Sequence, residues 1–560
     1  MRKRYRLADA VEQVGDDFLL AQLLKNREIE NIEEFLDPSF DDGFHDPFLM
    51  RDMDKAVERI LKAIDNNEKI LIYSDYDADG IPAGVMMKDF FDLIGYQKAS
   101  NYIPHRHDEG FGLNREAIDT FAESGVNLLI TLDCGIADYD EIAYANERGI
   151  DVIVTDHHEL AGILPPAIAV VDPKREDCDY PFDGLCGSGV GWKVIQGLMQ
   201  SRDFGIKPGQ EKWLLDMVGL ATLSDMVPLI DENRILGKFG LMVLRKSPRP
   251  GIQKLVKRLN MDQRFITEDD IGFMIAPRIN AASRMGDPAD AFYLLSTKDE
   301  AEGDGFAKKL EEINNERKGV VASIVKEVKK KLKARSEMPE VIVMGNPDWR
   351  PSLVGLVANS VSEEYKCPVF LWGREGKNLI KGSCRSDGVT DLVHLMKSLP
   401  DIFSQFGGHK MAGGFSVFEH AVHHMEERLC EIFRTLEHNE ISEEIILDNK
   451  LTLADITINN YKIIERMSPF GIDNRKPLFI FQNVEIVGMK LFGKQKNHLS
   501  LTLRDASQKR IEAIAFFAGP DSFKVEIRPG IIVDIVAHIE KAIFRGRIEL
   551  RLRLVDVLKS

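Results

Sequence analysis

Three short apolar runs, each followed at once by acidic residues, constrain the fold of this chain most strongly. The runs cover residues 69–73, 126–132 and 151–155. Their length and composition are typical of strands that are buried on both faces of a parallel sheet. The stretches between them have the apolar spacing of helices, over residues 83–93, 115–123 and 141–148. This alternation predicts an α/β fold with a doubly wound parallel sheet.

The residues that follow these runs are acids and histidines. The first run is followed by Ser-Asp-Tyr-Asp-Ala-Asp-Gly (74–80), the second by Asp133, and the third by Asp156-His157-His158. Asp225 follows a further apolar run within residues 219–228, and we interpret it as a fourth strand end. The carboxyl ends of parallel strands meet at one edge of a sheet. We therefore expect side chains from separate segments to lie within reach of one another: Asp77, Asp79, Asp133, His157 and Asp225.

Crowded carboxylates repel each other by roughly 4 kcal/mol for two unit charges 4 Å apart at an effective dielectric of 20. Carboxylates with one or two imidazoles and no cysteine suit Mn²⁺ or Mg²⁺ better than a structural zinc ion. The number of acids predicts two ions bridged by a carboxylate, the arrangement used for in-line displacement at phosphorus. A single Asp-x-Asp is more often a solvated loop or a helix cap, so the prediction rests on the recurrence of acids after successive runs.

The charge is unevenly distributed along the 560 residues. The net charge is −17, whereas residues 451–560 carry 18 Lys/Arg and 12 Asp/Glu, a net of +6, which leaves −23 for the first 450 residues. Such asymmetry fits a C-terminal module that binds a polyanion. An inert, unevenly charged surface fits it equally.

Changes of pattern along the chain predict five parts. Residues 1–45 are expected to form an N-terminal adaptor of short helices, 46–300 the α/β domain with the acids, 301–338 a connecting helix, 339–440 a second α/β domain and 441–560 a small β-barrel. The connecting helix is predicted from apolar residues at helical spacing between Phe306 and Leu332, with lysines at its C-terminal end. Short alternating runs at residues 498–503, 511–517, 531–538 and 547–555 predict the strands of the barrel.

The six cysteines, at positions 134, 178, 186, 367, 384 and 430, show no C-x-x-C spacing. We therefore expect reduced thiols rather than a disulfide framework or a zinc site. Acids interrupt any apolar core of a leader segment near residue 10. No stretch approaches the roughly 18 uninterrupted apolar residues of a membrane span. These features favour a cytoplasmic protein.

Four segments resemble the motifs of the DHH phosphoesterase superfamily: residues 75–80, Leu-Asp-Cys-Gly (132–135), Thr-Asp-His-His (155–158) and Ser224-Asp225. Gly-Gly-His-Lys-Met-Ala-Gly-Gly-Phe (407–415) resembles the glycine-rich signature of the DHH-associated domain. Residues 276–286 and 310–317, together with the barrel, are similar to the RecJ family of single-strand-specific 5′→3′ DNA exonucleases. The resemblance implies that the barrel is an OB fold.

The resemblance also implies roles for the acids and histidines. The implied metal ligands are Asp77, Asp79, Asp133, His157 and Asp225, with Asp75 either a ligand or a supporting acid. Asp156 and His158 flank His157 and would orient it or act at the phosphate. Arg278 is expected to clamp the scissile phosphate, since a guanidinium binds phosphate bidentately. An ion pair of Arg278 with Asp287 is the alternative.

Further residues are expected to hold the nucleic-acid strand. Asn280 and Arg284 lie close to Arg278 in the sequence, and the resemblance places this segment over the site. A 5′-phosphate pocket is expected from Ser383 and Arg385 in a glycine-flanked turn (382–386) and from Arg106 in a basic loop, while Gly408 and His409 would approach a nucleotide. The candidates for strand contacts in the barrel are Phe516, Phe517, Phe544, Arg545 and Arg547. Core packing is the alternative for each phenylalanine.

The resulting prediction is a Mn²⁺- or Mg²⁺-dependent exonuclease that degrades single-stranded DNA from its 5′ end, in DNA repair and recombination. We expect a monomer that does not bind membranes, with single-strand-binding protein and a helicase as candidate partners. The alternatives are a DHH phosphodiesterase acting on short oligonucleotides or cyclic dinucleotides, and an inactive single-strand-binding scaffold. The chain departs from the family pattern at residues 349–355, which lack the histidine and glycine that are usual after Trp349. It also departs at Ser283 and Cys384, where glycine is common. These departures leave the expected metal ligands intact.

Overall fold

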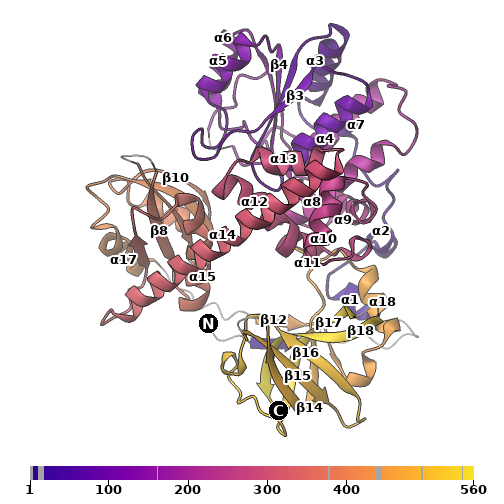
Figure 1. The fold of residues 1–560 in the computed structure, drawn as a ribbon, viewed down its shortest axis with the longest axis vertical. Coiled ribbons are helices and arrows are strands. Elements are labelled where there is room, and N and C mark those ends of the chain that lie inside the picture. Colours follow the sequence, from indigo (N-terminus) through magenta and orange to yellow (C-terminus); the bar gives the residue numbers. More distant parts are fainter. Residues whose placement is uncertain are drawn as a thin grey trace. The chain divides into compact units, whose positions relative to one another are not determined.

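The computed structural model describes residues 4–9, 18–160, 162–375, 379–436, 444–493, 496–544 and 547–560. The chain folds into two compact units. One comprises Asp46–Asp225 and Leu241–Ile441, and the other comprises Arg2–His45, Met226–Gly240 and Ser442–Ser560. Figure 1 colours the elements of both units by their position in the sequence.

The first unit contains a five-stranded parallel sheet in the order β3-β2-β4-β5-β6. Its strands are β2 (Ile70–Ser74), β3 (Ala99–Tyr102), β4 (Leu128–Leu132), β5 (Asp151–Thr155) and β6 (Ala169–Val171). All five residues of β2 and of β4 are buried, as expected for central strands covered on both faces. Helices α5 (Arg115–Glu123) and α6 (Tyr139–Glu147) pack on one face, and α4 (Gly80–Leu93) and α7 (Gly187–Ser201) pack together against β2 and β4. The predicted doubly wound sheet is confirmed.

The sequence did not predict the two edge strands, β3 and β6, and it predicted a strand before Asp225 where the structure has a helix. Asp225 does not follow a strand. It is the C-cap of helix α8 (Leu215–Ser224), in which Leu215–Thr222 are all buried. A helix that is apolar all round shows no 3.6-residue period, so a short run of it cannot be distinguished from a buried strand.

Helix α14 (Glu300–Lys333) is a single 34-residue helix, whereas the connecting helix was predicted over 301–338. The side chain of Asp299 caps it by accepting hydrogen bonds from the amides of Ala301 and Glu302, at 2.8 and 2.9 Å. The lysines at its C-terminal end are favourably placed against the helix dipole. In Figure 1 this helix runs from the region of α10 (Pro250–Arg258) and α13 (Ala289–Ser296) to that of α15 (Pro351–Tyr365).

Beyond α14 the same unit contains a second sheet in the order β10-β11-β9-β8-β7. Its strands are β7 (Ile342–Gly345), β8 (Val369–Glu375), β9 (Leu379–Arg385), β10 (Phe403–His409) and β11 (Ala412–Val417), of which only the β7–β8 pair is parallel. The predicted turn at 382–386 is wrong, because Gly382–Arg385 lie in the central strand β9. A Cβ on Gly382 would lie 2.2 Å from the ring of Phe415. The glycine therefore admits a neighbouring aromatic ring and does not form a turn.

The second unit is built on a closed β-barrel, as predicted. Strands β14 (Phe479–Phe492), β15 (His498–Arg504), β16 (Arg510–Ala515), β18 (Arg547–Lys559) and β17 (Ile532–Phe544) pair in that order, and β17 closes on β14. The strand expected over 511–517 ends at Ala515, which leaves Phe516 and Phe517 beyond it. Residues 4–7 form strand β1 (Arg4–Leu7), paired with β12 (Glu444–Leu447), where only helices were expected. Helices α1 (Phe18–Lys25) and α2 (Ile32–Leu36) add Leu23, Leu24 and Phe35 to the barrel core.

All six cysteines are free thiols. Within the described ranges, no helix has the length and apolar character needed to cross a membrane.

Candidate metal centre

The loop after β2 carries Asp75, Asp77 and Asp79, and backbone contacts hold it in place. Oδ1 of Asp77 accepts hydrogen bonds from the amides of Asp79 and Gly80, at 2.8 and 3.1 Å, and so starts α4. Gly80 has no room for a side chain, because a Cβ there would lie 2.5 Å from the carbonyl oxygen of Asp75. The amide of Ala78 donates to Oδ1 of Asn280 at 2.9 Å. Asn280, predicted to bind substrate, therefore braces the acidic loop.

The carboxylate of Asp79 lies at the N-terminus of α7. The amides of Gly187 and Ser188 donate to its two oxygens at 2.6 and 2.8 Å, and the Ser188 hydroxyl donates to the Asp79 carbonyl at 2.9 Å. The positive end of a helix dipole stabilises a carboxylate in this position. Sequence reasoning missed both residues, which carry no acidic or metal-binding group.

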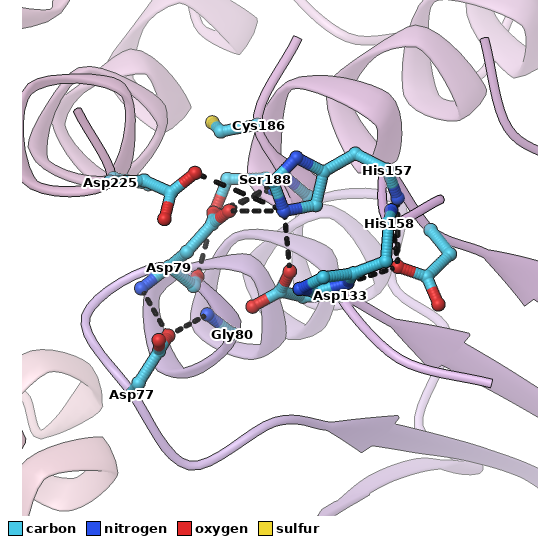
Figure 2. A network of polar contacts seen from close by, with 12 residues as sticks. Asp77, Asp79, Gly80, Asp133, His157, His158, Cys186, Ser188 and Asp225 are labelled. Carbon is cyan, nitrogen blue, oxygen red and sulfur yellow. Dashed lines mark hydrogen bonds and ion pairs between the residues drawn. The ribbon is translucent and has the colours of Figure 1, made fainter. Parts of the chain in front are cut away.

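His157 lies among three of the acids, as Figure 2 shows. Its Nε2 is 3.2 Å from Oδ1 of Asp133 and 3.9 Å from Oδ2 of both Asp79 and Asp225. Burial, followed by the charge of His158, lowers the pKa of His157 to about 3. The imidazole is therefore neutral, which is the form that binds a metal ion.

Burial and mutual repulsion make the ionised cluster unfavourable. Burial and then the charge of Asp77 raise the pKa of Asp79 to about 6, and burial and then Asp79 raise that of Asp225 to about 8. The pKa values of Asp75 and Asp133 lie well above the ordinary value for the same two kinds of cause. Among the residues that the structure describes, Oδ1 of Asp75 and Oδ1 of Asp133 are buried without a hydrogen-bond partner. A bound cation would give these two buried oxygens the electrostatic partner that they lack.

The donor atoms fit divalent cations. Three sets have donor atoms that all lie within 4.8 Å of one another: Asp75, Asp77 and Asp133; Asp79, His157 and Asp225; and Asp133, His157 and His158. Asp133 belongs to the first set, and its Oδ1 lies 3.2 Å from Nε2 of His157, which belongs to the second, as expected of a carboxylate that bridges two ions. Oxygen donors with an imidazole and no thiolate match the preferences of Mn²⁺ and Mg²⁺. The structure thus brings together all six nominated metal ligands, Asp75, Asp77, Asp79, Asp133, His157 and Asp225.

Asp156 holds the two histidines in place through hydrogen bonds. Its Oδ1 accepts hydrogen bonds from the amide of His157 and from Nδ1 of His158, at 2.8 and 2.7 Å, and its Oδ2 accepts from the amide of Ile136 at 2.9 Å. Burial is the largest single effect and opposes charge on both partners, but their hydrogen bond and the surrounding charges together outweigh it. They lower the pKa of Asp156 and raise the pKa of His158 to about 9. His158 is therefore a cation at neutral pH.

Three arginines lie on the approach to the acids. The guanidinium of Arg106 stacks over the ring of Tyr76, 4.9 Å from its centroid. Arg284 is bound to helix α15 through Nη1, which donates to the Ser352 carbonyl at 2.9 Å. Burial, followed by the charges of Arg106 and Arg317, lowers the pKa of Arg284 to about 10, and Asp77 and Arg385 also act on it. Arg106 and Arg385 thus act electrostatically on Arg284, which also lies within electrostatic range of Asp77.

Arg278 is placed differently from both expectations. It is buried on α12 (Ala276–Met285), where Nε donates to Oε2 of Glu311 and Nη1 to the Met274 carbonyl, each at 2.5 Å. The alternative of an ion pair was right in kind but named the wrong partner, Asp287. Because Glu311 lies on helix α14, 33 residues further on, no local pattern in the sequence predicts this pair.

The remaining nominated residues fall into two regions. Gly408 (φ +130°) and His409 lie exposed in the β10–β11 hairpin, and Ser383 lies with Arg385 on β9 beside Gly355. In the barrel, Phe516 packs under the guanidinium of Arg553 at 4.1 Å, whereas Phe517 is 82% exposed. Arg545 and the side chains of Phe544 and Arg547 lie outside the described residues.

Sequence reasoning also missed an acid and a cation at the end of β6. Asp172 is buried, and burial raises its pKa to about 7. Lys174 acts electrostatically on both His157 and Asp225. The signal was present, since Ala-Val-Val-Asp (169–172) repeats the pattern of an apolar run followed by an acid. Three residues are, however, a short run for a strand.

Comparison with known proteins agrees with this architecture. Three family models match in chain order: the DHH family, N-terminal domain, over residues 69–222; the DHHA1 domain, over 338–438; and the RecJ OB domain, over 447–556. The single-stranded-DNA-specific exonuclease RecJ of Bacillus subtilis (strain 168) is 33% identical over 560 residues, covering 99% of this chain and 70% of the relative. The protein of the same name from Escherichia coli (strain K12) is 31% identical over 446 residues, covering 76% of this chain and 77% of the relative.

Among solved structures, RecJ from Thermus thermophilus in complex with Mn²⁺ matches with a TM-score of 0.82 at 25% identity, over 100% of this chain and 80% of that one. Similarity in sequence and in fold thus extends across the sheet with the acids, the second sheet and the barrel. Since one third of the residues are identical to a RecJ protein along nearly the whole chain, this chain belongs to the RecJ family.

Proposed function

We propose that this chain is a single-stranded-DNA-specific exonuclease that hydrolyses phosphodiester bonds from the 5′ end and releases 5′-mononucleotides, with Mn²⁺ or Mg²⁺ as its cofactor. The observation that carries the proposal is the group of carboxylates around a neutral His157, with Arg284 within electrostatic range of Asp77. The names of the relatives support the choice of substrate, and we propose a role in DNA repair and recombination.

The acids and His157 would hold two ions, with Asp133 shared between them and Asp75 as a ligand or a supporting acid. When bound, such ions lower the pKa of an attacking water and stabilise charge on the leaving oxygen. The protein supplies the positioning. Asp156 orients the two histidines, and protonated His158 places a positive charge beside the phosphate.

The arginines would hold the strand. Arg284 is better placed than Arg278 to clamp the scissile phosphate, because Arg278 is paired with Glu311 whereas Arg284 lies within electrostatic range of Asp77. Arg106 and Arg385, with Ser383, would bind the 5′-phosphate and so set the direction of digestion. Gly408 and His409 would approach the first nucleotides, and Phe516 and Phe517 on the barrel would contact more distant bases.

We further propose that the protein acts as a monomer in the cytoplasm and that single-strand-binding protein and a helicase supply its substrate. Free thiols at all six cysteines support a reducing compartment.

The test uses 30-nucleotide strands labelled at either end, with a 5′-phosphate, in the presence of Mn²⁺ or EDTA. We expect the 5′ label to be released as a mononucleotide only with Mn²⁺, and duplex DNA to resist. Faster cleavage of a dinucleotide than of the 30-mer would instead favour the short-substrate phosphodiesterase. Binding without cleavage under all conditions would favour the inactive scaffold.

A further inference from the structure

A groove of about 760 Å³ lies between the C-terminal half of α14 and helix α15, outside the metal centre described above. Six cations line it: Arg317, Lys318, Lys326, Lys329, Lys330 and Lys333. Val321, Val325 and Leu356 give it an aliphatic floor. No residue of this groove was nominated from the sequence, where the lysines were assigned only to the end of a helix.

Most of this positive charge has no partner within the protein. Lys329 pairs with Glu364, but in the part of the chain that the structure describes Lys326, Lys330 and Lys333 are exposed and make no ion pair. They lie at spacings of three and four residues, on one face of α14, and span about 10 Å at 1.5 Å per residue. The first 450 residues carry a net charge of −23, so these lysines concentrate positive charge in an otherwise acidic part of the chain.

The groove is electrostatically continuous with the metal centre. Arg317, at one end of the groove, acts on Arg284, and Arg284 in turn lies within electrostatic range of Asp77. Nε of Arg317 is buried and has no hydrogen-bond partner among the described residues. A buried guanidinium nitrogen without a partner is costly unless a ligand satisfies it. Positive charge therefore extends from the acids along α14.

We propose that this groove binds the sugar–phosphate backbone of single-stranded DNA beyond the nucleotides held at the metal centre. The inference rests on the proposed function, which supplies a polyanion longer than the metal centre can hold. The lysines match the phosphates in charge, and the aliphatic floor accepts sugars and bases without a sequence preference. Among the described residues no aromatic ring lines the groove, so binding there depends on charge and not on stacking.

The test compares two triple variants of the full-length protein. The groove variant is Lys326→Glu, Lys330→Glu and Lys333→Glu. The control variant is Lys62→Glu, Lys257→Glu and Lys308→Glu, which makes the same change of net charge at three exposed lysines outside the groove. Binding of 30- and 4-nucleotide strands is measured without divalent ions from 50 to 200 mM salt, and cleavage of both strands is measured with Mn²⁺.

Each phosphate contact contributes about 0.7 to the slope of log Kd against log salt, so losing three contacts should reduce the slope by about 2 for the 30-mer. The ratio of the wild-type affinity for the 30-mer to that of the groove variant should then shrink about 15-fold between 50 and 200 mM salt. On the 4-mer we expect unchanged kcat and KM, which a damaged metal centre could not give. The control variant should keep the wild-type slope.

Three results would overturn the inference. The groove variant could match the control on the 30-mer, or it could lose the 4-mer and the 30-mer equally. It could also keep its DNA affinity while losing affinity for polyglutamate, which would identify an acidic protein as the occupant. Failure of the proposed function is a separate result, since the wild type itself would then leave the 30-mer uncleaved in Mn²⁺.

Discussion

The backbone amide of Gly187 lies 2.6 Å from Oδ2 of Asp79, although 108 positions separate the two residues in the chain. The N-terminus of α7 thus holds one of the central carboxylates in place. Gly187 also faces Asp133, because a Cβ on it would lie 2.5 Å from Oδ1 of that residue. The geometry of the candidate metal centre therefore depends on a helix start that contributes no metal-binding group.

Replacing Gly187 by alanine should weaken metal binding without unfolding the protein. The added methyl group would displace Asp133, the carboxylate shared by two of the donor sets. We expect Mn²⁺ affinity, measured by calorimetric titration, to fall by about 10- to 100-fold, the usual cost of disturbing groups that orient metal ligands. Gln200→Ala, at an exposed position of the same helix, should titrate like the wild type. Unchanged Mn²⁺ affinity in the Gly187→Ala variant would contradict the prediction.

Asp133→Asn should abolish cleavage and leave strand binding measurable. Asn tolerates the left-handed backbone of Asp133 (φ +64°), so the loop keeps its shape while the bridging charge is lost. We expect the rate with Mn²⁺ to fall at least about 100-fold and the affinity for a 5′-phosphorylated 30-mer, measured without metal, to change less than threefold. A variant that retains cleavage would exclude Asp133 as the bridging carboxylate.

Without metal, the protein should lose stability as the pH rises towards 8. The pKa of Asp79 is raised to about 6 and that of Asp225 to about 8, from an ordinary value near 3.9. Such carboxyls take up protons on folding, so their contribution is present at low pH and is lost as the pH rises through the folded-state pKa. The melting temperature of the metal-free wild type should therefore fall between pH 6 and 8, and Asp225→Asn should reduce that fall.

With Mn²⁺ bound, the wild type should have a higher melting temperature at pH 8 than Asp225→Asn. The ion stabilises the ionised acids of the wild type, whereas the variant has lost one ligand. Asp140→Asn, at an exposed acid whose surroundings differ from those of the cluster, serves as the control and should follow the wild type with and without metal. Parallel pH profiles for the wild type and Asp225→Asn would show that Asp225 does not titrate in this range.

The sequence predicted the three strands at the centre of the first sheet and the acids that follow them, because both signals are local. Asp75, Asp77 and Asp79 follow shortly after the four apolar residues 70–73, and parallel topology then brings Asp133 and His157 to the same edge. The role of Arg278 was not predictable in this way. Its partner Glu311 lies on another helix, and only tertiary packing determines which of several nearby arginines remains free to meet a ligand.

The wrong secondary structure was predicted where the periodicity of apolar residues carries little information. Asp225 was assigned to a strand end because α8 is buried all round, and residues 382–386 were assigned to a turn because small residues there make room for Phe415 of a neighbouring strand. In both places the determining fact is what packs against the segment. Single-residue composition does not contain that fact.

Asp156→Asn should remove the positive charge of His158 at weakly alkaline pH. Burial lowers the pKa of His158, but its hydrogen bond and ion pair with Asp156, helped by the charges of Asp75 and Asp225, outweigh burial and raise it to about 9. Without the carboxylate it should return towards the ordinary value near 6.5, so the protonated fraction at pH 8 should fall from about nine in ten to about one in thirty. Nuclear magnetic resonance of the imidazole in the metal-free protein measures this directly. A midpoint that stays near 9 would mean that Asp156 does not set the charge of His158.

Phe517→Ala should weaken the binding of long strands. The ring is 82% exposed, and the residue adopts a left-handed backbone (φ +54°) that is uncommon for phenylalanine. Its amide donates to Nδ1 of His498 at 2.9 Å, and the two rings meet edge to face at 4.8 Å. The ring is therefore held out in solvent by its neighbours, as expected of a platform on which a base stacks.

Loss of one stacking contact costs about 1–3 kcal/mol, so the affinity for a 30-nucleotide strand should fall roughly 5- to 150-fold. Cleavage of a 4-nucleotide strand should be unchanged, because the substitution lies on the barrel and leaves the metal centre intact. Ile532→Ala removes a side chain that is 60% exposed on the same barrel and should bind the 30-mer like the wild type. If Phe517→Ala and Ile532→Ala bind equally well, the exposed ring is not a stacking platform, and strand binding by the barrel must depend on its basic residues.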